Sequence, residues 1–109
     1  MPELAFRGKK FNNPVELSLD IIGGKWKIPI IWRLKDDTKR YGELRKSLPG
    51  VTHKMLTTQL RELERDEIIS RKVYSEIPPK VEYDLTLLGK SVIPLLREWG
   101  EEYRSVFDK

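Results

Sequence analysis

Residues 52–85 carry the pattern that most narrows what this chain can fold into. A helix is predicted over 52–63, because Leu56, Leu60 and Leu63 recur at helical spacing and share one face within about 60° of arc. Residues 68–74 and 80–85 then have strand character on either side of a loop at 75–79. The loop contains Pro78-Pro79, which cannot continue a hydrogen-bonded ladder. The pattern therefore indicates an amphipathic helix followed at once by a two-stranded hairpin.

The opposite face of the predicted helix is basic. Lys54, Thr58, Arg61 and Arg65 fall within a similar arc on that side, with Thr57 beside them. One face is suited to a core and the other to a polar partner, which is the division that a DNA-recognition helix requires.

Three helices are predicted before this point. The first covers residues 14–22, with Asn13 as its cap and Gly23-Gly24 as its end. The second, over residues 25–35, is apolar on nearly every side and is therefore expected to be buried. A short third helix over residues 41–48 leads through Pro49-Gly50 to Thr52, which caps the basic helix.

This order of elements is that of a winged helix-turn-helix. The predicted fold class is mainly α with a small β-hairpin wing (α+β), and residues 13–109 form the DNA-binding domain with its C-terminal dimerisation helix. Residues 1–12 are expected to be a loose or partly ordered N-terminal arm. In such a fold a helix enters the major groove while the hairpin flanks it along the backbone.

The charge distribution supports this interpretation. Residues 39–61 contain six basic side chains and one acidic side chain, while the net charge of the whole chain is +4. The whole positive excess thus lies on the predicted helix-turn-helix, as phosphate binding requires. A solvated basic face without a ligand is the plainer alternative.

The last predicted helix begins after Thr86, and its apolar stripe is longer than the core of one small domain can cover. Such a stripe favours a second copy of the chain as partner, so the fold is expected to dimerise through its terminal helices. The predicted dimer interface comprises Leu95, Leu96, Trp99, Tyr103, Val106 and Phe107.

A series of short motifs over residues 13–99 resembles the HxlR-type family of small dimeric winged-helix transcription regulators, which are distantly similar to MarR-type regulators. The resemblance implies a sequence-specific regulator that binds a palindromic DNA operator as a homodimer. The motifs are Pro14-Val15, Ile22-Gly23-Gly24-Lys25-Trp26, Tyr41-Gly42-Glu43-Leu44, Leu48-Pro49-Gly50, Met55-Leu56-Thr57, Leu60-Arg61-Glu62-Leu63, Pro78-Pro79-Lys80-Val81-Glu82-Tyr83 and Leu85-Thr86-Leu87-Leu88-Gly89.

One position departs from the family pattern. Many members carry a cysteine just before the Pro-Val pair, and some use it to sense oxidants or electrophiles, whereas this chain has Asn13 there. The sequence contains no cysteine, so thiol sensing is excluded.

The candidate DNA contacts lie on and around the basic helix. Arg61 or Lys54 could read guanine, the threonines could meet phosphate or a thymine methyl, and Lys80 is expected at the wing tip against the backbone or minor groove. The full set is Lys39, Arg40, Thr52, His53, Lys54, Thr57, Thr58, Arg61 and Lys80.

Catalytic, metal and cofactor functions are not expected. His53 is the only histidine, and one histidine without cysteines cannot supply the three or four ligands of a zinc site. Gly23-Gly24-Lys25 lacks the GxxxxGK[ST] spacing of a phosphate-binding loop. The adjacent pairs Asp36-Asp37 and Glu101-Glu102 do not face each other as acid and base, so no enzyme is predicted.

The expected partners are double-stranded operator DNA and a second copy of the chain. A small-molecule effector of unspecified class is a third, with a cleft near Trp26 and Trp32 as its candidate site. No membrane segment or signal peptide is predicted, which favours a cytoplasmic protein. The alternative function is a winged-helix module that binds proteins without specific DNA recognition.

Overall fold

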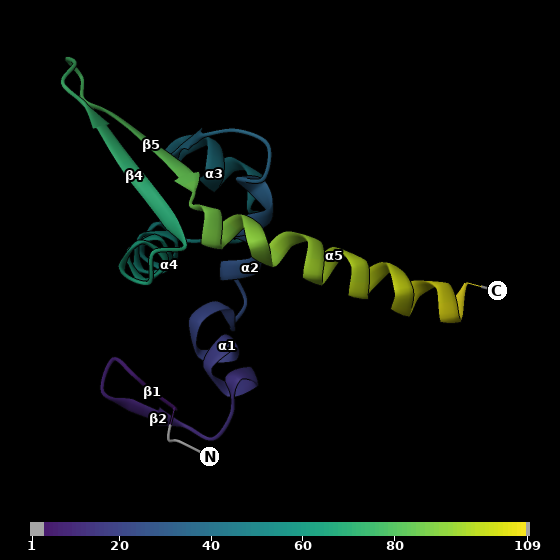
Figure 1. Cartoon of the computed structure of the whole chain (residues 1–109). Helices are drawn as coiled ribbons and strands as arrows, with labels where there is room; N and C mark the ends of the chain where they lie inside the picture. Colours follow the sequence, from purple (N-terminus) through teal and green to yellow (C-terminus); the bar gives the residue numbers. More distant parts are fainter. Residues whose placement is uncertain (1–3, 109) are drawn as a thin grey trace.

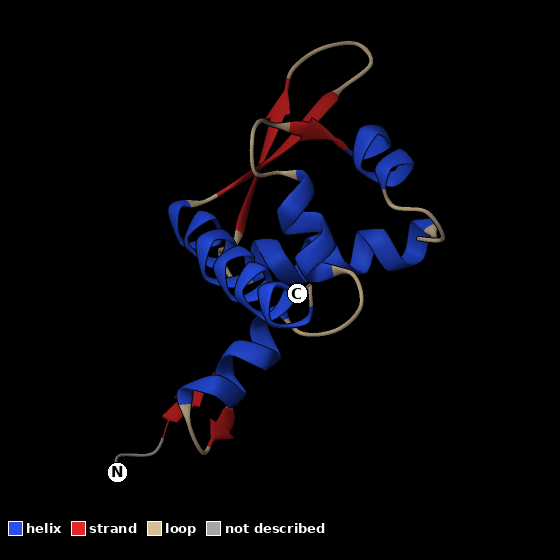
Figure 2. Ribbon diagram, turned by 90° about the vertical axis from the view of Figure 1, so that its right-hand side faces the viewer, coloured by secondary structure: helices blue, strands red, loops and turns tan. Residues whose placement is uncertain are grey.

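A computed structural model describes residues 4–108 and contains a helix-turn-helix, a small sheet and a long C-terminal helix (Figures 1 and 2). Its elements are β1 (Leu4–Phe6), β2 (Lys9–Phe11), α1 (Pro14–Ile22), α2 (Lys27–Arg33), β3 (Lys39–Arg40), α3 (Tyr41–Ser47), α4 (His53–Arg65), β4 (Ile69–Tyr74), β5 (Lys80–Leu85) and α5 (Leu87–Phe107).

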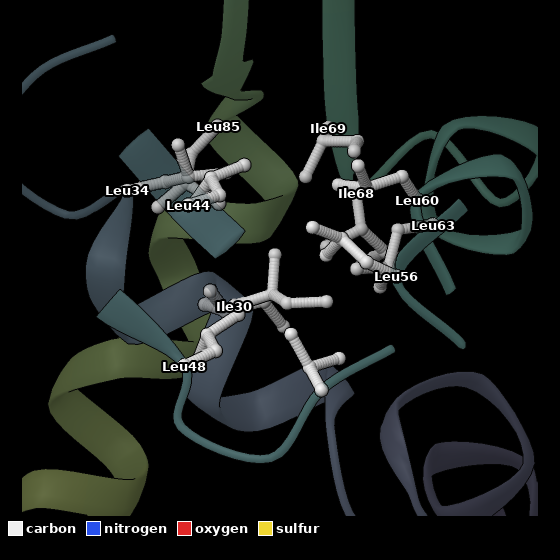
Figure 3. Packing of buried hydrophobic residues seen from close by; sticks show 12 residues of the cluster. Ile30, Leu34, Leu44, Leu48, Leu56, Leu60, Leu63, Ile68, Ile69 and Leu85 are labelled. Carbon is white, nitrogen blue, oxygen red and sulfur yellow. The ribbon is translucent and has the colours of Figure 1, made fainter. Parts of the chain in front are cut away.

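The core confirms the predicted inward face of α4. Leu56, Leu60 and Leu63 are all buried, and the first and last of them are 0% exposed. They pack in one cluster with side chains from α2, α3, the turn before α4 and the sheet (Figure 3). The other buried members are Ile30, Ile31, Leu34, Leu44, Leu48, Val51, Ile68, Ile69 and Leu85.

The second helix is shorter and less buried than its apolar sequence predicted. It covers Lys27–Arg33, and only one side of it enters the core, because Trp32 remains 38% exposed. Lys27 is buried instead, with its ammonium 3.7 Å from Glu62 of α4. The side of α2 that carries Trp32 thus remains partly open to solvent, although the sequence of this helix is apolar on nearly every side.

The wing is a three-stranded antiparallel sheet in the order β3-β5-β4, with one strand more than predicted. The additional strand β3 pairs Lys39 with Tyr83 and Arg40 with Glu82. Two residues are too short for an alternating pattern, which explains why the sequence did not reveal this strand. Of β5, only Leu85 is buried, while the predicted inward residues Val81 and Tyr83 are half-buried.

A hairpin orders residues 4–11 of the N-terminal arm, which was expected to be loose or partly ordered. Strands β1 and β2 pair in register, and the turn between them places Arg7 and Gly8 at φ 51° and 76°. Two left-handed residues suit a two-residue hairpin turn. Residues 1–3 of the predicted arm lie outside the described residues.

The C-terminal helix α5 leaves the domain and extends to the side opposite the wing (Figure 1). Its start is fastened to the α4–β4 turn, where the Thr86 N–H donates to the carbonyl oxygen of Ile68 at 3.1 Å. Gly89 is buried there. A Cβ at this position would lie 2.2 Å from the same oxygen, so any other residue would require the backbone to move. Farther along, the apolar residues of α5 are exposed in the single chain.

Candidate nucleic-acid interface

Helix α4 is positioned by the turn before it. Gly50 has φ +87°, a conformation that side-chain-bearing residues rarely adopt, and the buried Val51 then anchors the chain. Thr52 is the N-cap, and its hydroxyl oxygen accepts a hydrogen bond from the Met55 N–H at 3.1 Å. Thr52 was predicted as a DNA contact, but its hydroxyl already has this structural partner.

The outward face of α4 carries two cations without acidic partners. Lys54 and Arg61 are exposed, and neither forms an ion pair with any residue between 4 and 108. Thr58 is exposed beside them, while Thr57 is half-buried. These side chains project from the face opposite Leu56 and Leu60, so a rigid helix presents them to solvent.

The third basic residue predicted on this face, Arg65, has a different role. Arg65 forms a two-point contact with Asp66, with both donor–acceptor distances at 3.0 Å. Its guanidinium is therefore committed to the end of α4 and is less available to DNA than Arg61.

A groove of about 490 Å³ separates α4 from the wing. Thr57 and Arg61 line it from the helix, and Arg71 and Tyr83 line it from the sheet. The Arg71 Nε lies 3.2 Å from a carboxylate oxygen of Glu64, so an ion pair spans the groove. Burial raises the pKa of Tyr83, which keeps its phenol neutral at physiological pH.

Lys39 and Arg40 lie on β3, at the edge of the wing, and not on a helix. The Lys39 ammonium is 2.8 Å from Asp37, and this hydrogen bond raises the pKa of Lys39. The Arg40 backbone N–H donates to Glu43 at 3.0 Å and so helps to begin α3. The Arg40 side chain remains exposed beside the wing loop.

Lys80 lies where the wing loop meets β5, as the predicted strand over residues 80–85 placed it. Lys80 is the first residue of β5 and pairs with Tyr74, so the tip is formed by the loop between them, where Ile77 is fully exposed. The Lys80 ammonium lies 2.9 Å from Glu82, and the hydrogen bond between them lowers the pKa of Glu82 and raises that of Lys80. The positive charge of Lys80 is thus largely neutralised within the wing.

His53 is the first residue of α4, and its Nδ1 lies 2.6 Å from the hydroxyl of Tyr41, the first residue of α3. Tyr41 was not among the predicted site residues. In the sequence, Tyr41 stands out only as part of the Tyr41-Gly42-Glu43-Leu44 motif. This motif does not predict a contact with a histidine twelve residues later.

Trp26 and Trp32, which were expected beside one effector cleft, lie in different places in the structure. Trp32 lines a mainly apolar groove of about 380 Å³ between α2 and α5, together with Ile28, Val92, Leu96 and the side chain of Arg97. Trp26 does not line this groove and instead approaches Gly50, so the two tryptophans do not share one cleft.

Metal sites and membrane-spanning helices are absent from the part of the chain that the structure describes. Residues 4–108 contain no group of three or more histidine, cysteine or acidic side chains that could hold a metal ion. Over the same residues, no helix combines the length and the apolar character needed to cross a bilayer.

An exposed basic helix, placed by a tight turn after a shorter helix and flanked by a small antiparallel wing, defines a winged helix-turn-helix DNA-binding transcription regulator. The chain belongs to the HxlR-like helix-turn-helix family, whose model matches residues 21–107.

Similar proteins agree with this membership. The chain is 52% identical over 99 residues to the HTH-type transcriptional regulator YdeP of Bacillus subtilis (strain 168), covering 88% of this chain and 77% of that protein. The solved structure of the redox regulator HypR in its reduced form is 48% identical with a TM-score of 0.78, covering 88% of this chain and 98% of that one. The structure of the HTH-type regulator ytcD is 46% identical with a TM-score of 0.77, covering 85% and 98%.

The comparison with HypR also marks a difference. HypR is named a redox regulator, whereas the 109 residues of this chain include no cysteine. The side-chain oxygen of Asn13 accepts a hydrogen bond from the Glu16 N–H at 2.9 Å and caps α1.

Proposed function

We propose that the chain binds a palindromic DNA operator as a homodimer, with α4 in the major groove and the wing beside the adjacent backbone. The observation that carries this proposal is the pair of exposed, unpaired cations Lys54 and Arg61 on the outward face of α4. An arginine on a recognition helix can bond both acceptors of guanine, and a lysine can neutralise phosphate.

We divide the remaining candidate DNA contacts by whether their side chains already have partners within the chain. Thr57, Thr58 and His53 keep polar groups on or beside the outward face of α4, so we assign them to DNA contact with Lys54 and Arg61. Lys39, Arg40, Thr52 and Lys80 flank this face, and we assign them weaker contacts, since three of these side chains have partners within the chain.

The homodimer is supported by the exposed apolar face of α5. Trp99, Tyr103 and Phe107 are 66%, 55% and 68% exposed and form a ladder of aromatic rings, with centroids 5.5 Å and 4.8 Å apart. Leu95, Leu96 and Val106 extend this surface. An exposed aromatic ladder of this kind is costly in water and is typical of a surface that a second subunit covers. We include Val15 and Leu19 of α1, which are similarly exposed, in the same interface.

The proposal is tested by selection of bound sequences from random double-stranded DNA, followed by footprinting of the selected site. We expect two inverted half-sites whose centres lie about one helical turn (~10 base pairs), or a multiple of it, apart. Full affinity for one isolated half-site would contradict the dimeric arrangement. The absence of any selected sequence, with weak salt dependence, would instead favour the protein-interaction module.

A further inference from the structure

The tyrosine that begins α3 and the histidine that begins α4 are in direct contact. The Tyr41 hydroxyl oxygen lies 2.6 Å from Nδ1 of His53, and the two rings meet edge-on with centroids 5.3 Å apart. The turn of the helix-turn-helix brings these residues together. Both also line the groove between α4 and the wing.

The direction of the hydrogen bond between Tyr41 and His53 depends on which tautomer the imidazole adopts. The same hydroxyl lies 3.3 Å from the carbonyl oxygen of His53, which is a much longer contact than the one to Nδ1. A phenol that donates to Nδ1 requires this nitrogen to be an acceptor, and a neutral imidazole then carries its proton on Nε2.

We propose that Tyr41 is a positioning residue for DNA binding, which holds His53 as the Nε2–H tautomer so that this N–H can donate to a DNA phosphate. The proposal rests on the proposed function, because it needs α4 to face DNA. His53 is exposed, and Nε2 lies on the side of the ring away from the nitrogen that Tyr41 occupies. A fixed neutral donor adds a directed contact beside the ammonium of Lys54.

The charged and titratable groups around His53 are compatible with this role. Arg61 and Glu64 of α4, Arg71 of β4 and Tyr83 of β5 line the same groove. The one carboxylate among them, that of Glu64, is engaged 3.2 Å from Arg71, which leaves the Nε2–H of His53 available for an outside acceptor.

The proposal makes the effect of Tyr41 depend on pH. Imidazole groups change charge between about pH 5 and pH 8, and a protonated imidazole carries hydrogens on both nitrogens. Nδ1 then donates to the Tyr41 oxygen, and Nε2–H is present whether or not a phenol is there. The hydroxyl is therefore needed for the tautomer only when His53 is neutral.

The first experiment reads the tautomer without DNA. His53 is the only histidine of the chain, so proton–nitrogen correlation spectra of its ring are unambiguous. At a pH where the spectra show a neutral ring, we expect the Nε2–H pattern in the unsubstituted protein and a shift toward an exchanging mixture in Tyr41→Phe. The control Tyr74→Phe removes a hydroxyl that contacts Glu82 at 3.3 Å and should leave the His53 signals unchanged. An Nδ1–H pattern, or an unchanged pattern in Tyr41→Phe, would overturn the proposal.

The second experiment measures affinity for a labelled mixed-sequence duplex, because phosphate contacts do not depend on sequence. At about pH 7.5 we expect Tyr41→Phe to bind roughly twofold more weakly, because a ring without the phenol exchanges between two tautomers and only one of them carries Nε2–H. At a more acidic pH, where the same ring spectra show a protonated imidazole, the deficit should largely disappear. His53→Ala should bind weakly at both pH values, and adding Tyr41→Phe to it should have no further effect.

The outcomes separate the two proposals. If the unsubstituted chain binds no DNA, the proposed function fails, and the phosphate contact fails with it. If the chain binds DNA but Tyr41→Phe is equally weak at both pH values, the role of the hydroxyl is structural and this inference is wrong, while the proposed function stands.

Discussion

The Nε atom of Arg7 lies 2.7 Å from Oδ1 of Asp66, which fastens the N-terminal hairpin to the end of α4. The Asp66 side chain is 0% exposed, and Arg65 contacts its second oxygen at 3.0 Å. A guanidinium of Arg7 also donates to the Arg65 carbonyl oxygen. One buried carboxylate thus joins the first hairpin of the chain to the helix that carries the DNA contacts.

The first prediction concerns the pH dependence of this link. Burial by itself would raise the pKa of Asp66, but the hydrogen bonds and charges of Arg65 and Arg7 outweigh it, so the net pKa is lowered. The stabilisation is therefore present above the unfolded-state pKa of about 3.9 and is lost as the pH falls through the lower folded-state value. Asp66→Asn should reduce the free energy of unfolding by about 1–2 kcal/mol at neutral pH.

Urea unfolding at neutral and acidic pH measures this effect. The difference between Asp66→Asn and the unsubstituted chain should shrink on acidification. Lys9→Ala is the matched control, because the Lys9–Asp20 pair at 3.2 Å is more exposed and should contribute less than about 1 kcal/mol. A constant difference at all pH values would contradict the assignment.

The second prediction compares two glycines of α5. Gly89→Ala places a Cβ 2.2 Å from the Ile68 carbonyl oxygen and should cost about 1–3 kcal/mol of stability, since backbone must move. Gly100→Ala meets nothing within 4 Å and should stabilise the helix by about 0.5–1 kcal/mol. Thermal and urea unfolding at one protein concentration test the pair, and equal effects would refute the close approach.

The third prediction concerns association. Trp99→Glu places a charge at the first ring of the exposed aromatic ladder and should yield monomers, or unfolded protein, in sedimentation experiments. Glu102→Gln, on an exposed position of the same helix, should leave the oligomeric state unchanged. A folded Trp99→Glu dimer with undiminished affinity would show that the subunits meet elsewhere.

The fourth prediction concerns base recognition. Arg61→Ala should cost about 1–3 kcal/mol of binding free energy and relax the preference at one base position, if its guanidinium bonds guanine. Repeating the selection with the variant measures the preference directly. Because Arg61 is exposed, the substitution should leave stability within about 0.5 kcal/mol. An unchanged selected sequence would remove Arg61 from base readout.

The fifth prediction distinguishes free from neutralised cations. Lys54→Ala should lower the slope of log affinity against log salt by about one, since one phosphate contact is lost. Lys80→Ala should lower it by less, because Glu82 already lies 2.9 Å from its ammonium. Lys90→Ala, on α5, serves as the control. A larger slope change for Lys80 than for Lys54 would mean that the wing, and not α4, carries the phosphate contacts.

Much of the fold could be predicted from local patterns. The spacing of Leu56, Leu60 and Leu63 set the inward face of α4, and Asn13-Pro14 and Gly23 marked the ends of α1 where the structure has them. The N-terminal hairpin had no comparable signal, because Arg7-Gly8 is a weak turn sequence and three-residue strands show no reliable alternation.

The candidate site was predicted less completely. Lys54 and Arg61 lie on the exposed basic face of α4, as their helical spacing indicated. Lys39 was selected for its charge and Lys80 for its charge and its place beside the wing loop, and the structure pairs them with Asp37 and Glu82. Charge can be counted along a sequence, but its neutralisation depends on which carboxylate the fold brings within reach.

By itself the sequence determined the order of the elements, the two faces of α4, the family and the unmatched apolar stripe of α5. These features follow from periodicity and capping, which act between residues a few positions apart. Only the tertiary structure decided that β3 joins the wing, that Arg7 meets Asp66 and that Tyr41 meets His53. Such contacts join distant parts of the chain, and they exist because burying the shared core brings their backbones together.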